Sequence, residues 1–226
     1  MTTNVLDHTH LEISLKDLRE ELSDLLSRDP TVVKEVRITQ FDEACEEDFE
    51  KFLFHYSYLE LLVMEGRFLI TDDYLKIIGA KLKKLQRLAI AMNTSITDVG
   101  LVYLSGDRES NPSEEASCPL LESLEIERAC GISNKGIQTI TSQLQKLQNL
   151  DLWVNEVDKN VLQCIASMKS LKNVTLKSEG KSLMTDYAMM EEAVFKMVYH
   201  DEMGLSSENG YMQRWIQRCQ QPSNSE

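Results

Sequence analysis

Short apolar blocks with the spacing Leu-x-x-Leu-x-(Leu or Ile) recur along most of this chain. The clearest pair begins at Leu85, in LQRLAIAMNTSITDVGL, and at Leu121, in LESLEIERACGISNKGI. Beyond the block, the two segments agree at four later positions: Ile96 and Ile132, Asp98 and Asn134, Gly100 and Gly136, and Leu101 and Ile137. Agreement in the block and at these later positions indicates an internal repeat, and a repeat of this length predicts a stack of similar units.

The repeat extends from residue 33 to about residue 177. Its blocks begin at Val33, Leu59, Leu85, Leu121, Leu147 and Leu171, so successive starts are 26, 26, 36, 26 and 24 residues apart. The long interval is one unit plus an insertion, which is the polar stretch SGDRESNPSEEAS, residues 105–117. Because this stretch has no large apolar side chain, we expect it to form a loop.

Each block predicts a short strand, because its alternate residues are apolar, and each interval predicts a helix. Expected strands include Val36–Ile38, Leu88–Ile90 and Leu124–Ile126, and expected helices are Glu47–His55, Asp73–Leu82, Val99–Leu104, Lys135–Leu144 and Lys159–Met168. Asp98 and Asn134 are expected to cap their helices, and Gly100 and Gly136 to leave room in a tight turn. The predicted fold is an α/β solenoid of about six parallel strands on its concave face, with helices on its convex face.

The two terminal segments are interpreted as helical caps that cover the open ends of the stack. Residues 1–32 predict a polar tail up to residue 12 and then a helix that begins at Ser14 and that Pro30 ends. Residues 33–178 hold the repeats, and residues 179–226 form a helical cap and a tail. Within that last segment Met184–Met203 is interpreted as a capping helix or, alternatively, as a methionine-rich face that adapts to a partner; Tyr211–Cys219 is expected to be a short helix.

The third, fifth and seventh residues of each block should point away from the core and form columns across the sheet. These residues are Glu35, Arg37, Thr39; Leu61, Val63, Glu65; Arg87, Ala89, Ala91; Ser123, Glu125, Glu127; Asn149, Asp151, Trp153; and Asn173, Thr175, Lys177. They contain an apolar area and an acidic area, both candidates for binding a partner. An exposed tryptophan beside charge is typical of the centre of an interface. Trp153 is therefore the main candidate, unless the C-terminal segment covers it. The predicted partner-binding residues are Trp153, Asp151, Glu125, Glu127, Leu61, Val63, Ala89 and Arg87.

The segment Cys118-Pro119-Leu120-Leu121 before a strand and the segment Ile96-Thr97-Asp98-Val99-Gly100-Leu101 after one carry a family resemblance. The chain resembles the leucine-rich repeat proteins and, within them, the cysteine-containing subtype that is typical of F-box-associated receptors. It departs from that subtype at the ninth position of the repeat, where cysteine is usual and where this chain has Asn93, Ala129 and Asn155. A complete F-box of helices does not fit into the 32 residues before the repeats.

Charge and cysteine usage restrict the partners and the compartment. The formal charge is 24 − 37 = −13, which disfavours nucleic acid and anionic membrane surfaces as partners. No apolar run is long enough for a membrane span, and the N-terminal residues show no targeting signal. The five cysteines are scattered and form no C-x-x-C pair, so we expect reduced thiols in a cytoplasmic or nuclear protein.

The sequence contains little that is typical of catalysis. The common nucleophile, phosphate-loop, dinucleotide and zinc-protease motifs are absent from it. His8 and His10 lack a third metal ligand nearby, and Cys164 lies among aliphatic residues as a core residue would. The six acids of the stretch DEACEEDFE, residues 42–50, are interpreted as a solvated face or, alternatively, as a docking patch for a basic partner. We therefore expect no enzyme activity, no cofactor and no metal.

Two functions fit this picture. The first is a non-catalytic protein-protein interaction scaffold, including the substrate-recognition or adaptor component of a ubiquitin-ligase complex that the resemblance implies. The second is a structural assembly or coupling subunit of a larger complex, including a mitochondrial one. In either case we expect a protein partner with a basic segment, and a monomer outside the complex.

Overall fold

The computed structural model describes residues 9–14, 22–39, 46–65, 70–91, 94–106, 117–154, 158–179, 198–200 and 209–215. Its main sheet has nine strands in the order β1-β2-β3-β5-β7-β9-β10-β12-β11. The first seven run parallel to one another and follow the chain: β1 (His10–Ser14), β2 (Glu35–Thr39), β3 (Leu61–Glu65), β5 (Arg87–Ala91), β7 (Ser123–Ile126), β9 (Asn149–Trp153) and β10 (Asn173–Glu179). The strands expected from the repeat are thereby confirmed.

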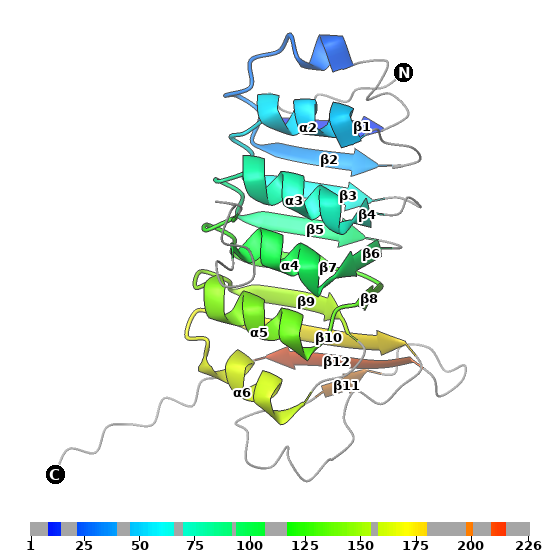
Figure 1. Cartoon of the computed structure of the whole chain (residues 1–226), viewed down its shortest axis with the longest axis vertical. Coiled ribbons are helices and arrows are strands. Elements are labelled where there is room, and N and C mark those ends of the chain that lie inside the picture. Colours follow the sequence, from blue (N-terminus) through cyan, green and yellow to red (C-terminus); the bar gives the residue numbers. More distant parts are fainter. Residues whose placement is uncertain are drawn as a thin grey trace, which may run out of the picture.

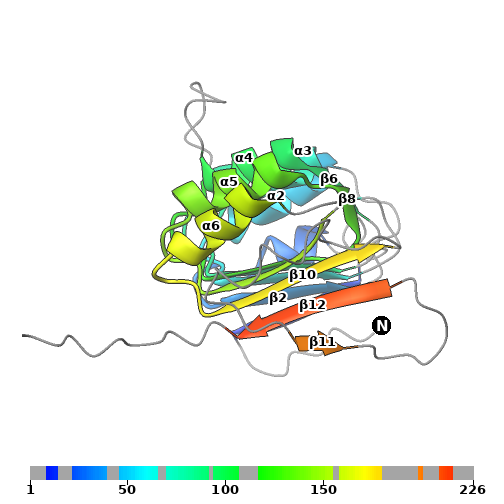
Figure 2. The ribbon, with the colours of Figure 1, turned by 90° about the horizontal axis from the view of Figure 1, so that it is seen from below.

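Helices lie on one side of this sheet only, among the elements that the structure describes (Figures 1 and 2). They are α2 (Glu46–His55), α3 (Asp72–Lys81), α4 (Asp98–Ser105), α5 (Asn134–Gln143) and α6 (Lys159–Ser167). None of them differs from its expected range by more than one residue at either end. Short strands precede three of the helices and pair as a second, parallel sheet: β4 (Ile70–Thr71), β6 (Thr94–Thr97) and β8 (Ala129–Gly131). The fold is α/β with a mostly parallel main sheet.

The core lies between the main sheet and the helices, as the alternation of each block requires. The second residue of each block-derived strand is at most 5% exposed: Val36, Leu62, Leu88, Leu124, Leu150 and Val174. Neighbouring units are also joined just before their strands, where the amide of Glu60 donates to the carbonyl of Lys34 at 2.8 Å and the amide of Gln86 donates to that of Glu60 at 2.8 Å. The same bond recurs further along at 2.7 Å, from Glu122 to Gln86. The units are therefore stacked in one fixed register.

A second set of contacts joins the units where their helices begin. The carboxylate of Asp72, the first residue of α3, accepts hydrogen bonds from the amide of Thr97 at 2.8 Å and from its hydroxyl at 2.6 Å. One unit later, the carboxylate of Asp98 accepts from the amide of Ser133 at 2.8 Å and from its hydroxyl at 2.6 Å. Each acid thus bonds to the next unit rather than within its own helix.

This arrangement corrects the expectation that Asp98 and Asn134 cap their helices. The caps are the preceding residues: the hydroxyl oxygens of Thr97 and Ser133 accept from the amides of Val99 and Lys135, both at 3.1 Å. Each hydroxyl accepts from its own helix and donates its proton to the acid of the unit before. The sequence alone could not show whether Thr97 or Asp98 caps the helix, because the two residues are adjacent and both side chains can accept a hydrogen bond.

The glycines of the repeat make room for the same carboxylates. A Cβ atom on Gly100 would lie 2.4 Å from Oδ1 of Asp72, and one on Gly136 would lie 2.3 Å from Oδ1 of Asp98. The expectation of tight packing at these positions is confirmed, and its cause is the acid of the preceding unit.

The N-terminal segment differs from its expected form. Residues 10–14, assigned to a tail and to the start of a helix, form β1, which pairs with β2 from His10 opposite Glu35 to Ser14 opposite Thr39. Leu11 and Ile13 are 2% and 4% exposed, so this short alternation joins the core. Of the expected helix, residues 22–25 are helical, and residues 15–21 lie outside the described part.

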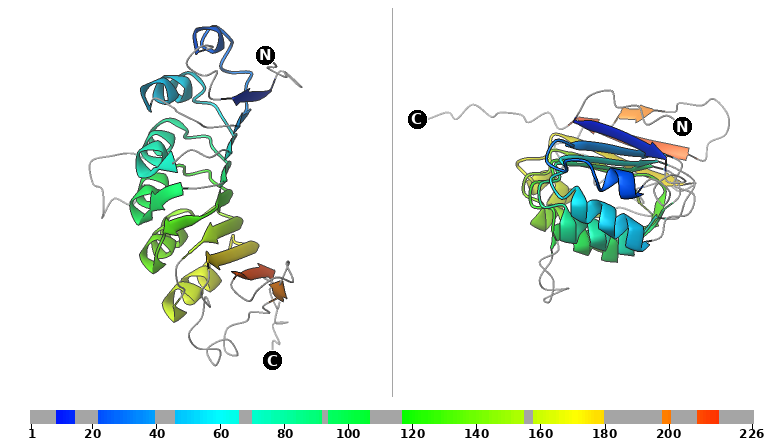
Figure 3. Two further views of the ribbon diagram at one scale, coloured as in Figure 1. Left: turned by 90° about the vertical axis from the view of Figure 1, so that its right-hand side faces the viewer. Right: turned by 90° about the horizontal axis from the view of Figure 1, so that it is seen from above.

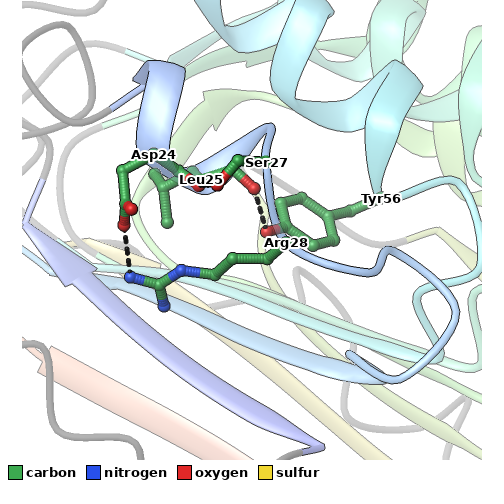
Figure 4. A network of polar contacts seen from close by, with 5 residues as sticks. All are labelled: Asp24, Leu25, Ser27, Arg28 and Tyr56. Atoms are coloured by element: carbon green, nitrogen blue, oxygen red, sulfur yellow. Dashed lines mark hydrogen bonds and ion pairs between the residues drawn. The ribbon is translucent and has the colours of Figure 1, made fainter.

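Polar contacts fix this helical turn to the first unit (Figure 4). The buried Tyr56 hydroxyl donates to the carbonyl of Leu25 at 2.7 Å. Arg28 donates to the carboxylate of Asp24 at 2.7 Å, and its own carbonyl lies 2.9 Å from Nε2 of His55. Burial raises the pKa of the Tyr56 phenol, which therefore stays a hydrogen-bond donor at neutral pH.

The C-terminal segment also differs from its expected form. β12 (Asn209–Trp215) runs antiparallel to β10, and β11 (Val198–His200) runs antiparallel to β12. These strands replace the end of the expected helix Met184–Met203 and the start of the expected helix Tyr211–Cys219. The last repeat strand offers a row of backbone groups at its edge, and pairing with them overrides a local preference for helix. Residues 180–197 lie outside the described part.

The ends of the inserted loop are well defined. Ser105 belongs to α4 and is 6% exposed, and Gly106 ends the helix with a left-handed φ of 71°. On the other side, the amide of Ser117 donates to the carbonyl of Gly79 at 3.1 Å, and that of Cys118 donates to Leu104 at 2.8 Å. Residues 107–116, the rest of the expected loop, lie outside the described residues.

The register of the sheet can be tested on β7. Replacing the buried Leu124 by alanine should lower the free energy of unfolding by about 2–5 kcal/mol, because it leaves a cavity. The matched change Glu125→Ala, on the opposite face, should cost about 0.5 kcal/mol or less. Equal shifts of the two urea midpoints would contradict the alternation described above, since a slip by one residue exchanges the two faces.

The contact between Asp98, Ser133 and Gly136 can be tested by a double-mutant cycle. Gly136→Ala should be destabilising by about 1–3 kcal/mol, because the added methyl group displaces the Asp98 carboxylate. Asp98→Ala should cost about 1–3 kcal/mol, because it leaves the Ser133 amide without its acceptor. In the Asp98→Ala background, Gly136→Ala should cost clearly less than it does alone. Additive losses in urea unfolding would show that the two residues do not meet.

Candidate interaction face

One side of the main sheet is not covered by any described helix (Figure 3). The residues of the repeat strands that alternate with the buried ones lie on that side. The register places one residue of each strand in a continuous row, which we call the central column: Glu12, Arg37, Val63, Ala89, Glu125, Asp151 and Thr175. A parallel row holds His10, Glu35, Leu61, Arg87, Ser123, Asn149 and Asn173. Neighbouring members of a column lie about 4.8 Å apart. The columns expected from the repeat are thus side by side, and β1 adds Glu12 and His10 to them.

At its N-terminal end this face is crossed by ion pairs between neighbouring strands. Arg37 on β2 pairs with Glu65 on β3, and Nδ1 of His10 lies 3.2 Å from Oε2 of Glu35. Near the starts of the strands, Nζ of Lys34 lies 3.8 Å from Oε1 of Glu60. Charges of opposite sign are therefore already paired in this part of the face.

An apolar area follows in the middle of the face. Leu61 and Val63 on β3 and Ala89 on β5 are half-buried, and Arg87 beside them is exposed. Across the two strands, Leu61 is paired with Arg87 and Val63 with Ala89. The area is small, because Ala89 contributes only a methyl group.

An acidic area lies beyond it on β7 and β9. Glu125 and Asp151 stand directly opposite each other in the register, and both are half-buried. Glu127 follows the end of β7, where its amide donates to the carbonyl of Ile90 at 2.9 Å. The next residue, Arg128, has a φ of 58°, which ends the strand with a turn. The register thus places Glu125 beside Asp151, and Glu127 lies just beyond the end of β7.

Trp153 is the last residue of β9, on the same face as Asp151. Its side chain is half-buried, and its Nε1 atom is buried and has no hydrogen-bond partner among the described residues. β12 extends the sheet beside β10, two strands away from β9, and the indole remains partly accessible. A rigid, partly exposed indole beside carboxylates has the composition of an interface centre.

The cysteines and histidines are the residues considered for catalysis or metal binding. Burial raises the pKa of the Cys118 thiol to about 12, so this cysteine is protonated at neutral pH. Cys164 is half-buried on α6. Over the described ranges, no group of three or more His, Cys, Asp or Glu side chains is arranged to hold a metal ion. His8 lies outside these ranges, and the ring of His10 contacts Glu35.

Sequence reasoning missed the part of the face that β1 contributes. The signal for it was the alternation of His10, Leu11, Glu12, Ile13 and Ser14, which is short and lies in a polar context. It also missed three lysines whose head groups lie over exposed aromatic rings: Lys34 and Lys84 over Tyr58, and Lys81 over Phe54. No repeat motif marks those residues.

In the part of the chain that the structure describes, no helix has the length and apolar character needed to cross a membrane. A scan of protein-family models finds none that matches this chain. A search of curated proteins likewise finds no matching relative.

Proposed function

We propose that this chain is a non-catalytic protein-protein interaction scaffold of the leucine-rich repeat type. In this proposal the stacked units form a solenoid, and the outward face of the main sheet is its concave binding surface. The binding centre is the cluster of Trp153, Asp151, Glu125 and Glu127, and the area of Leu61, Val63, Ala89 and Arg87 extends it.

The observation that carries this proposal is the unbroken register of the central column. Seven strands present their outward residues in line, and no described helix lies on that side. A regular, rigid surface that exposes half-buried apolar side chains next to carboxylates loses little entropy on binding. Such a surface suits an extended protein segment better than a small molecule, because small molecules are bound in clefts or cavities that bury most of their surface.

The chemistry of the cluster suggests the partner. Glu125, Asp151 and Glu127 favour a segment rich in lysine or arginine, which long-range attraction steers towards them. The formal net charge of −13 acts in the same direction. We propose further that the chain works in the cytoplasm or the nucleus, as a substrate-recognition or adaptor component of a ubiquitin-ligase complex. The resemblance of its repeats to those of F-box-associated receptors supports that assignment.

Native affinity purification read by mass spectrometry tests the proposal. Wild-type chain should retain a defined set of proteins with basic segments, and the variant Trp153→Ala/Asp151→Lys should lose them. The control Asp73→Lys, on the exposed side of α3, makes the same charge reversal on the helix side and should retain them. Ligase components among the retained proteins would support the adaptor role, whereas identical sets from all three chains would refute the proposed face.

Quantitative binding to the retained partner should separate the roles of the two residue types. Trp153→Ala should cost about 2 kcal/mol of binding free energy, roughly a thirtyfold rise in Kd, through faster dissociation. Glu125→Lys should mainly slow association, and the association rate of wild type should fall as salt is added. Surface plasmon resonance at several salt concentrations measures both effects. An unchanged dissociation rate for Trp153→Ala would place the binding centre elsewhere.

A further inference from the structure

Exposed apolar side chains gather on one edge of the molecule, away from the interaction face. Four large apolar residues of the described part stand out by exposure: Val32 at 39%, Phe54 at 70%, Tyr58 at 41% and Val99 at 51%. The first three lie where helices end and the next strands begin. Val32 and Tyr58 each stand three residues before a strand, β2 and β3, and Phe54 lies at the end of α2. Val99 is apart from them, at the start of α4.

Lysine head groups lie over both aromatic rings of this edge. Nζ of Lys84 is 4.8 Å and Nζ of Lys34 is 5.7 Å from the ring centroid of Tyr58. Nζ of Lys81 is 5.3 Å from the ring centroid of Phe54. These distances are in the range of cation–π interactions. Lys34 comes from one unit, and Lys81 and Lys84 come from the next, so the stacking of units assembles the cluster.

Lysines outnumber acids along this edge, although the formal net charge of the chain is −13. Lysines recur at this edge, in the turns or just before the strands: Lys34, Lys83, Lys84, Lys146, Lys169 and Lys172. Helix carbonyl ends face this edge and favour cations, and Lys83 serves that purpose by donating to the carbonyl of Gly79 at 2.8 Å. Acids are also present. Glu50 lies 3.0 Å from Nζ of Lys81 and Glu60 lies 3.8 Å from Nζ of Lys34, and Glu122 holds the position equivalent to Glu60 before β7. The attraction of lysines to the carbonyl ends of helices does not by itself explain why three of them lie over the exposed rings of Tyr58 and Phe54.

We propose that this edge is a second protein-binding surface, the basic aromatic edge, formed by Val32, Lys34, Phe54, Tyr58, Lys81 and Lys84. Its occupant is an acidic amphipathic segment of a partner protein. Carboxylates of that segment bind the lysine heads, and its aliphatic or aromatic side chains cover the two rings. Large aromatic side chains supply contact area at small entropic cost, and desolvation on binding strengthens the contacts of the lysines. The charge of this surface is opposite to that of the acidic cluster around Asp151, so the two surfaces select different partners.

A defined probe tests the proposal on the full chain. The probe is a fluorescein-labelled synthetic peptide in which glutamate alternates with leucine and phenylalanine, and binding is measured by fluorescence anisotropy at several salt concentrations. Wild type should bind it, and binding should weaken with salt. Phe54→Ser/Tyr58→Ser and Lys81→Glu/Lys84→Glu should each raise the Kd at least about tenfold. All these side chains are exposed or half-buried at the surface, and urea unfolding of each variant verifies the fold.

Matched controls separate a site from general attraction. Val99→Ser removes an exposed apolar side chain elsewhere, and Lys146→Glu reverses a lysine at the position equivalent to Lys84 in a later unit; neither should change the Kd. Glu125→Lys/Asp151→Lys should not weaken binding either, so that failure of the interaction face and failure of this edge are distinguishable.

Four outcomes would overturn the proposal. They are no binding of the acidic peptide, equal binding of a lysine-containing counterpart, equal weakening by Lys146→Glu, and tighter binding of a single-stranded oligonucleotide of the same charge. A salt-sensitive dimer in analytical ultracentrifugation that disappears in the same variants, without peptide binding, would instead make a second copy the occupant.

Discussion

No unit of this chain can bury its own apolar strip, and the stacking of units is therefore the constraint on which the structure depends. Leu88 and Leu124 are each 1% exposed only because strands lie on both sides of them. Backbone bonds at the strand starts set the spacing of the stack on one side. At the helix starts, the carboxylates of Asp72 and Asp98 set it on the other, since each reaches the cap residue of the next unit. A carboxylate that accepts two hydrogen bonds in one geometry fixes both distance and direction, so the sheet register follows from contacts on both edges.

The parts of the fold that could be predicted are the elements that recur with the sequence repeat. The block strands and the helices from β2 to α6 follow from the alternation of Leu, Ile and Val and from the glycine positions, whereas the short strands β4, β6 and β8 were not predicted. The role of Asp98 could not be predicted, because its partner Ser133 belongs to another unit and only the fold brings them together. The same reason applies to β1 and β12. Neither has the full block, and each forms by pairing with the open edge of a neighbouring strand, a tertiary effect that local propensity does not contain.

For the interaction face, the sequence was sufficient to place residues in columns but not to say which charges are paired. Arg37 and Glu65 stand in neighbouring columns of adjacent strands and form an ion pair. This pair forms because the long side chain of Arg37 extends to the neighbouring column, which the register alone does not show. The exposed aromatic residues at the opposite edge were not predictable for a related reason. Tyr58 and Lys84 occupy equivalent turn positions of two units, and turn positions carry no hydrophobic periodicity that would single them out.

The signs of the charges along the face also determine which part of it suits a basic partner. Where Arg37 meets Glu65 and Lys34 meets Glu60, opposite charges lie side by side, and their fields largely cancel at a distance. Glu125 and Asp151 are like charges in direct register, which repel each other in the free protein. A cation placed between two such carboxylates gains attraction from both and removes their repulsion. The Trp153 indole next to them adds apolar area on one side of that position. Attraction and contact area therefore coincide at β7 and β9.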